Sequence, residues 1–310
     1  MCGIYGNERL GEKMKQNVRK PDYHVTPGAI DLFSKETVLS VYRKMAEARA
    51  FEACIVRAGK GGRFKIKVHM SSGQEAVSAA LAVVVPSYQY FVQHRSMDTF
   101  LALGGLPEQV RDEMLCLDTG CCGGRIGGTF NLHRDGRDVY NHTGFIGENI
   151  SVGVGAALGN GRNTVCLFGD GAAEEDYALT AYGFAATHKL PVLFVCTDND
   201  LSVLSPLLKR RSWNLAEVAA GFGLKTIDMA DDPFTIMQWI EEQEGQYPAL
   251  MNIRVCRNFW HAGLGVDGSP EWDRFLIVRE QLKERGWEQE MQKIDKEAAL
   301  RMEVVWKEYL

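Results

Sequence analysis

The spacing of hydrophobic residues along this chain predicts where its regular elements lie. In residues 36–55, apolar side chains recur every three or four positions, which is typical of an amphipathic helix. Residues 71–85 open with Ser-Ser-Gly and continue as an apolar run up to Pro86, which predicts a capped, buried helix. Residues 88–95 (YQYFVQHR) have the character of a short strand. The polar residues 1–35, broken by glycine and proline, are expected to form an N-terminal arm.

From residue 151 onward, continuous apolar runs alternate with helical segments. Strands are expected at 163–168, 191–200 and 249–260, and helices at 151–161, 178–190 and 232–245. Such an alternation predicts an α/β fold in which a parallel sheet is covered by helices on both faces. We find no internal repeat or linker, so residues 36–310 are expected to form one domain with a helical C-terminal extension.

Two further stretches stand out from this pattern. Residues 119–150 are dense in glycine, and loops of this length inside compact domains are often functional. The charged tail from residue 271 is helical by periodicity and is most simply a solvated face, although its apolar stripe offers a surface for a partner: Leu282, Trp287, Met291 and Ile294.

Composition narrows the class of protein. Of the 310 residues, 45% are hydrophobic and 24% charged, which is ordinary for a soluble globular protein. The formal charge of -5, with both signs interspersed, provides no basic stripe for nucleic acid. No apolar run approaches the roughly 18 residues that would suggest a membrane span. The eight cysteines lack paired spacing, several lie in apolar runs, and they are interpreted as reduced core residues of a cytoplasmic protein.

Two groups of cysteines do not predict a site. The opening MCGIYG resembles the start of amidotransferases with an N-terminal cysteine nucleophile. Such a domain would need about 200 residues, whereas the regular helices begin here by Glu36, so Cys2 is assigned to the arm. Three cysteines and a histidine in the glycine-rich stretch match no zinc spacing: Cys116, Cys121, Cys122 and His133.

The chemistry is predicted at the ends of two neighbouring strands. Gly169-Asp170-Gly171 follows one apolar strand, and Asn199 follows the next. Gly-Asp-Gly alone is a common turn, but parallel neighbours would bring Asp170 and Asn199 to the same sheet edge. A carboxylate and an amide oxygen suit Mg²⁺. The two glycines and the helix N-terminus near Ala172 suit a phosphate, so the pattern predicts a diphosphate bridged by magnesium.

These segments closely resemble the α subunits of thiamine diphosphate-dependent 2-oxo acid dehydrogenases and acetoin dehydrogenases. The resemblance rests on GDGAAEEDYALTAYGFAATHKLPVLFVCTDNDLSV (169–203), SSGQEAVSAAL, HTGFIGENISVGVGAAL and RNFWHAG. It implies metal ligation by Asp170, Asn199 and the Leu201 carbonyl. It further implies cofactor contacts from His94, Arg95, Gly144, Ile146, Gly169, Gly171 and Ala172, and a catalytic His261.

The family resemblance also implies a reaction and partners. Thiamine diphosphate would form a carbanion by decarboxylating a 2-oxo acid or cleaving an acyloin, and the acyl unit would be passed on, in some systems to a lipoyl acyltransferase. The glutamate that activates the cofactor would come from a separate β subunit, in an α2β2 assembly. The chain alone is therefore expected to be inactive.

Four departures from the family pattern keep alternatives open. Met97 and Asn131 stand where histidines are usual, Ala262 replaces serine, and Asp176 replaces glycine. A lost histidine removes a proton donor. The alternatives are a carboligase or acyl-transfer relative without a lipoyl partner, the N-terminal half of a split transketolase, or an inactive regulatory subunit. The remaining histidines are interpreted as surface or loop residues: His69, His133, His142 and His188.

Overall fold

A mostly parallel sheet of seven strands organises the chain. The computed structural model describes residues 24–126, 128–141, 144–243, 245–267 and 272–310, so Cys2 and His142 lie outside the described residues. The strand order is β2-β3-β1-β4-β5-β9-β8, and neighbours are parallel except β2 and β3. The strands are β1 (Gln89–Phe91), β2 (Leu132–Arg134), β3 (Arg137–Tyr140), β4 (Thr164–Gly169), β5 (Val192–Asp198), β8 (Lys225–Ala230) and β9 (Ala249–Arg254).

Successive side chains of the central strands enter two different cores. In β4, Val165 and Leu167 pack into one hydrophobic core, whereas Cys166 and Phe168 pack into another. Because side chains alternate across a strand, an uninterrupted apolar run means burial on both faces. The predicted α/β class with helices on both faces is confirmed.

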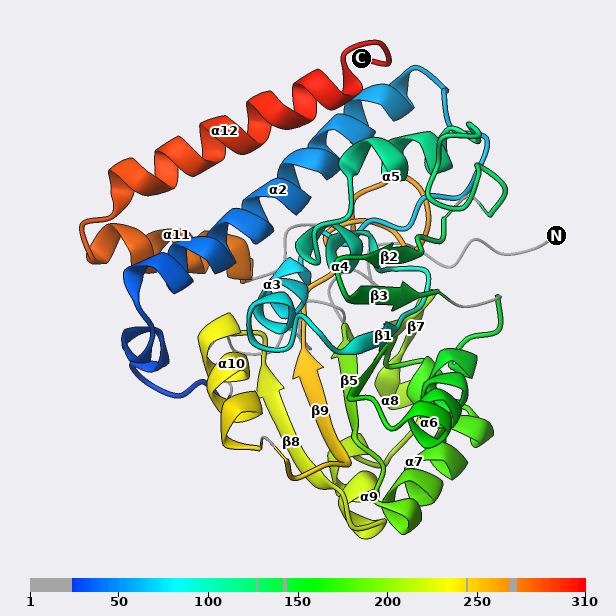
Figure 1. Cartoon of the computed structure of the whole chain (residues 1–310). Helices are drawn as coiled ribbons and strands as arrows, with labels where there is room; N and C mark the ends of the chain where they lie inside the picture. The colour runs from blue at the N-terminus through cyan, green and yellow to red at the C-terminus, as the bar shows by residue number, and fades with distance from the viewer. Residues whose placement is uncertain (1–23, 127, 142–143, 244, 268–271) are drawn as a thin grey trace, which may run out of the picture.

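Helices cover both faces of the sheet, with more of them on one face than on the other (Figure 1). One core receives side chains from α2 (Lys35–Lys60), α3 (Glu75–Val84), α4 (Met97–Ala102), α5 (Pro107–Met114), α10 (Pro233–Glu242), α11 (Arg274–Glu284) and α12 (Glu288–Trp306). The other receives α6 (Glu148–Asn160), α7 (Asp176–His188) and α9 (Leu215–Gly221). Shorter elements are the 3-10 turns η1 (Ala29–Leu32) and η2 (Ala172–Glu174), α8 (Leu207–Arg210) and the hairpin β6 (Leu201–Ser202) and β7 (Ser205–Pro206).

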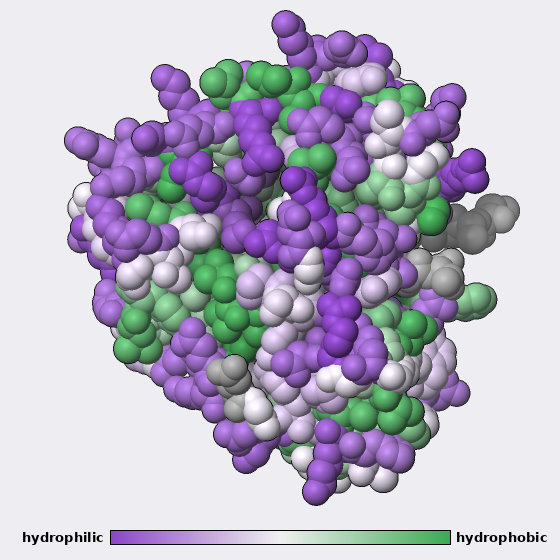
Figure 2. Space-filling model, in the orientation of Figure 1, coloured by the Kyte–Doolittle hydropathy of each residue, from purple (hydrophilic) through white to green (hydrophobic). Residues whose placement is uncertain are grey.

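The C-terminal helix α12 lies along α2 (Figure 1). Trp306 is fully buried with its ring 5.5 Å from that of Phe51, and the Tyr42 hydroxyl donates a hydrogen bond of 2.5 Å to Asp295. The apolar stripe of the tail therefore packs inside the chain, so the expectation that it offers a surface for a partner is wrong. The charged side of α12 is exposed, as expected for a solvated face. Hydrophilic side chains cover most of the outer side of this helical layer (Figure 2, upper left). Three members of the stripe, Leu282, Met291 and Ile294, are at most 3% exposed.

Several boundaries differ from the sequence expectation for physical reasons. The helix expected over 71–85 begins at Glu75, because Gly73 has a φ of 105°, which is outside the helical region. The backbone N–H groups of Ser71 and Ser72, ahead of the helix, bind the Glu52 carboxylate. The strand expected over 88–95 is only Gln89–Phe91 long. Inside the glycine-rich stretch lies the antiparallel β2–β3 hairpin, whose turn residues Asp135 and Gly136 have φ angles of 53° and 74°.

The strand order indicates where on the sheet a ligand is expected to bind. The chain leaves β1 for β3 on one side and then returns through α6 to β4 on the other side of β1. In open parallel sheets, ligands bind outside the carboxyl ends of the strands at such a reversal. The residues after β1 and β4 are therefore the first place to look for a site.

Two sequence expectations concern the molecule as a whole. Of the seven cysteines among the described residues, four are buried, while Cys116 is exposed and Cys121 and Cys122 are partly exposed. The expectation of core cysteines thus holds only for some of them. Among the described helices, none has the length and apolar character needed to cross a bilayer.

Candidate functional site

The ends of β4 and β5 bring the first predicted pair to one edge of the sheet. In the parallel register, Gly169 lies opposite Thr197, so Asp170 and Asn199 each follow the last residues of paired strands. The Asp170 side chain is buried, with a relative exposure of 2%. The Asn199 amide oxygen accepts a hydrogen bond of 3.1 Å from the backbone N–H of Leu201, which shapes the turn into β6.

The Gly-Asp-Gly turn is closely surrounded by the neighbouring loops. A β-carbon added at Gly171 would lie 2.6 Å from the Ser202 hydroxyl, and one at Gly169 would lie 3.0 Å from the Gln93 side chain. These glycines therefore allow a close approach that other residues would prevent. Gly147, with φ of 86°, is packed so that a β-carbon would lie 2.9 Å from the Ala172 carbonyl. The loop containing Gly144 and Ile146 thus lies against the same turn.

The family resemblance implies that Gly144 and Ile146 bind the cofactor ring through their backbone, but one of these backbone groups is already engaged. Gly144 is exposed and has a φ of 131°, a conformation that favours glycine. The Ile146 carbonyl already accepts a hydrogen bond from the Tyr177 hydroxyl. A ring hydrogen bond to that carbonyl would share it with, or displace, the tyrosine.

Three more loops are tied together next to β1. The Arg95 guanidinium donates to the Met70 carbonyl and, at 3.1 Å, to the His261 carbonyl. The loop after β9 also pairs with residues 68–73, because Gly263 N–H donates to the Val68 carbonyl at 2.8 Å. Residues from three distant parts of the chain therefore form one connected surface.

These hydrogen bonds between loops bring three histidines together. The rings of His94 and His261 have centroids 5.4 Å apart, and His69 lies 4.5 Å and 5.2 Å from them. Each of the three is partly buried. His69 is a loop residue, as expected from the sequence, but its place beside two candidate site residues was missed. Its nearness depends on the pairing of residues 68–73 with the β9 loop, which leaves no periodic signal.

Positive charge dominates this part of the surface. Burial, the Arg95 and Arg257 guanidinium groups and Lys67 lower the pKa of His261 to about 4, so its imidazole is neutral at neutral pH. Arg95 is 7% exposed and burial lowers its pKa to about 10, which still leaves it charged. Arg257 donates to Asp267 and to the Val203 carbonyl, but its buried Nη2 has no hydrogen-bond partner among the described residues.

Asp170 has a cationic neighbour that the sequence did not suggest. The Arg210 guanidinium, on α8, pairs with the Asp170 carboxylate and, at 2.7 Å, with Glu174. Burial and the Asp198 carboxylate raise the pKa of Asp170 to about 6, while Arg210 acts in the opposite direction. The predicted metal ligand is therefore already in an ion pair.

The residues present fit a diphosphate. A buried guanidinium nitrogen without a hydrogen-bond partner, as in Arg257, suits an anion. The glycine turn allows backbone N–H groups to approach a phosphate. For the metal, the carboxylate of Asp170 and the amide oxygen of Asn199 have the chemistry that Mg²⁺ prefers. The metal fits only if it shares Asp170 with Arg210 or displaces it.

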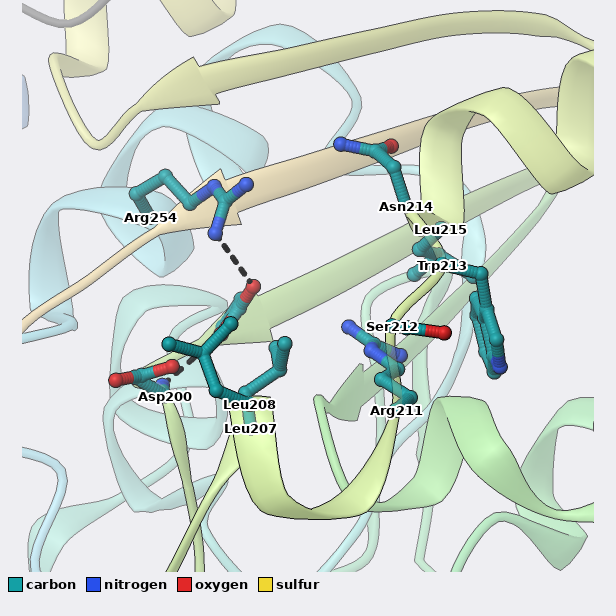
Figure 3. Close-up of a pocket in the computed structure, with 10 residues that line it drawn as sticks. Asp200, Leu207, Leu208, Arg211, Ser212, Trp213, Asn214, Leu215 and Arg254 are labelled. Atoms are coloured by element: carbon teal, nitrogen blue, oxygen red, sulfur yellow. Dashed lines mark hydrogen bonds and ion pairs between the residues drawn. The ribbon is translucent and has the colours of Figure 1, made fainter.

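A separate hollow of about 310 Å³ lies beside the site, on the β9 side (Figure 3). Asp198 and Asp200, which flank Asn199, line it, but none of the predicted site residues does. Arg254 points to its wall and binds Asp198 at 3.1 Å. Arg211 stacks on Trp213, with its guanidinium carbon 4.5 Å from the ring centroid. The hollow is thus a neighbour of the candidate site and not the site itself.

Two of the cysteines that match no zinc spacing, Cys121 and Cys122, lie beside a buried glutamate. Glu113, which is fully buried, accepts hydrogen bonds from the backbone N–H groups of Cys122, Gly124 and Ile126. Cys121 and Cys122 have their sulfur atoms 4.0 Å apart beside it. The Glu113 carboxylate is thereby used to shape the glycine-rich loop.

The four departures from the family pattern have different surroundings. Met97 is buried at the start of α4. The Asn131 amide oxygen accepts the backbone N–H of Asn141 at 2.8 Å and so ties β2 to the end of β3. Ala262 follows His261 in the β9 loop, and Asp176 begins α7.

The loops that meet at this sheet edge carry the motifs by which the sequence resembles dehydrogenase α subunits. The chain belongs to the dehydrogenase E1 component family, whose sequence profile matches residues 42–261. The matched region ends at His261 and includes all of the predicted site residues.

Individual relatives are pyruvate dehydrogenase subunits. The chain is 29% identical to the mitochondrial pyruvate dehydrogenase E1 component subunit alpha of Dictyostelium discoideum over 195 residues, which is 60% of this chain and 51% of that protein. It is 29% identical to the corresponding subunit of Porphyra purpurea over 252 residues (74% and 72%). For the human somatic form the values are 29% over 191 residues (59% and 48%). The matches to the Dictyostelium and human proteins thus span about half of their length.

Proposed function

We propose that this chain is the α-type subunit of an enzyme that decarboxylates a 2-oxo acid with thiamine diphosphate and Mg²⁺, and that a β-type subunit completes the site. One observation carries the proposal: the loops after β1, β4, β5 and β9 meet at one sheet edge around buried cations. The seven free cysteines among the described residues support a reducing, cytoplasmic setting.

The bound thiazolium would act as the electron sink for the carbanion. The residues of the chain supply binding and proton control. Arg95 and Arg257 would hold the diphosphate by charge-assisted hydrogen bonds. His261, neutral at neutral pH because its pKa is lowered to about 4, would donate a hydrogen bond near the reacting carbon. Asp170 and Asn199 would bind the metal through oxygen, with the Leu201 carbonyl as a third ligand.

Calorimetric titration of thiamine diphosphate tests this assignment. With the β-type chain and Mg²⁺ present, we expect Asp170→Ala to abolish binding, because it removes the only charged metal ligand in the proposed set. Asp135→Ala, in the exposed β2–β3 turn, is the control and should bind like the parent. Unchanged binding by Asp170→Ala would rule out the metal assignment.

A second function is favoured by the two missing histidines. Met97 is buried and Asn131 holds a backbone group, so neither offers a proton donor in place of the usual histidine. A carbanion that is protonated or oxidised less readily is available for carbon–carbon bond formation. A carboligase, or an acyl transferase without a lipoyl partner, is therefore the alternative. Product analysis after incubation with a 2-oxo acid and an aldehyde acceptor distinguishes the two.

A further inference from the structure

Arg210 occupies a position that bears directly on the metal of the proposed site. All three kinds of guanidinium nitrogen are engaged: Nη2 with Asp170, Nη1 with Glu174 at 2.7 Å, and Nε with the Ser205 carbonyl at 3.1 Å. The side chain is only 13% exposed. Arg210 is therefore held in one nearly buried position by its hydrogen bonds.

The contacts of Arg210 join the two segments that a metal would join. Asp170 and Glu174 belong to the turn after β4, whereas Ser205 lies on the hairpin that follows Asn199 and Leu201. A divalent ion between Asp170 and Asn199 would link the same turn to the same hairpin. The guanidinium supplies one positive charge there, to carboxylates that are 2% and 21% exposed.

Two cations on one buried carboxylate repel each other strongly, because little water screens them. Mg²⁺ also needs a carboxylate oxygen at about 2.1 Å in near-octahedral geometry, which a paired guanidinium restricts. We propose, given the proposed function, that Arg210 is a built-in competitor for the divalent metal: it neutralises Asp170 in the free chain, and the metal binds only when Arg210 is displaced.

The pairing has a consequence for the free chain. The turn after β4 and the hairpin after β5 are held together before any cofactor arrives. Displacement of Arg210 on metal binding releases its guanidinium beside the Gly-Asp-Gly turn, where a β-carbon on Gly171 would lie 3.7 Å from its Nη1. The freed cation then faces the region proposed for the diphosphate.

Titration with Mn²⁺ alone, followed by electron paramagnetic resonance on the full chain, tests the competition without cofactor or partner. We expect Arg210→Gln to bind Mn²⁺ at least about tenfold more tightly than the parent, since the competing charge is gone. Lys209→Gln, at the exposed neighbouring position on α8, should match the parent. The double variant Asp170→Asn/Arg210→Gln should lose the gained affinity.

Thermal unfolding gives an independent readout. Arg210→Gln leaves Asp170 without its paired guanidinium and Glu174 with only Arg211, at 3.6 Å. Its melting temperature should therefore fall by several degrees in EDTA and recover with Mn²⁺, while the parent changes little. If Arg210→Gln does not fold, Arg210→Met, which also lacks the positive charge, replaces it and should show the same changes.

Equal or weaker Mn²⁺ affinity in the Arg210 variants would overturn the inference. The proposed function is tested separately by thiamine diphosphate binding across a Mg²⁺ series with the β-type chain. Absence of cofactor binding at every Mg²⁺ concentration, together with the expected Mn²⁺ pattern, would refute the proposed function and leave the competition standing. Cofactor binding with no change in the Mg²⁺ midpoint in Arg210→Gln would count against the competition alone.

Discussion

Glu52 is a carboxylic acid placed inside the core, at 3% exposure. It accepts hydrogen bonds from the backbone N–H groups of Ser71 and, at 2.8 Å, Ser72. Burial nevertheless raises its pKa to about 7. The folded chain therefore binds a proton here that the unfolded chain releases near pH 4.3. The free energy of unfolding is expected to fall as the pH rises from about 4 to about 7, because the native state holds more protons in that window.

Urea unfolding at a series of pH values measures this contribution. Relative to the parent, Glu52→Gln should lose less stability between pH 4 and 8, by on the order of 3 kcal/mol. Its absolute stability also drops, because an amide cannot accept all of the carboxylate's hydrogen bonds, so the slope is the quantity to compare. Glu303→Gln, at an exposed site on α12, should keep the parental slope. Equal slopes for Glu52→Gln and the parent would contradict the assignment.

Residues at the candidate site divide into those that sequence could identify and those that it could not. Asp170, Asn199 and His261 carry recognisable local motifs, and strand order then brings the first two to one edge. Arg210 and His69 carry none. Their positions depend on contacts between loops far apart in the sequence, such as the 40 positions that separate Asp170 from Arg210. Spacing along the chain cannot reveal a pair of this kind.

Helix α12 is the element whose packing sets the stability of the helical layer. Trp306 is fully buried and makes edge contacts with Phe51 and, at a centroid distance of 6.0 Å, Phe64. Trp306→Ala would leave a large cavity and is expected to lower the free energy of unfolding by about 3–5 kcal/mol. Val304→Ala, two positions earlier and 67% exposed, should change it by less than about 0.5 kcal/mol. Chemical denaturation of both variants compares them; similar losses would disprove the packing role.

Some of the strands could be predicted from the sequence and others could not. Buried strands β4, β5 and β9 are uninterrupted apolar runs, and their two-sided burial follows from that pattern. The β2–β3 hairpin was missed because glycines on both sides obscured its alternation. Its signal was nevertheless present: Asp135-Gly136 is a favoured two-residue hairpin turn, and both residues have positive φ.

At the scale of the whole molecule, the apolar residues beside the site matter most. Phe145 is 75% exposed in the loop before α6, and Trp260 is 55% exposed next to His261. Under the proposed function, we expect both to contact the β-type subunit. We expect Phe145→Asp to weaken association at least about tenfold, because it buries a charge in the interface. Leu276→Asp, 54% exposed on α11, is the control. Analytical ultracentrifugation with the β-type chain measures both, and equal association would exclude this face.

The packing of α2 against α12 joins residues about 250 positions apart, as the hydrogen bond from Tyr42 to Asp295 shows. During synthesis, α2 leaves the ribosome about 250 residues before α12. At roughly 5–20 residues per second, the apolar side of α2 waits about 12–50 seconds for its cover. The apolar side of α2 therefore stays exposed until α12 has been made. We expect slower translation to lengthen this exposure and to make the yield more dependent on chaperones that bind apolar nascent segments.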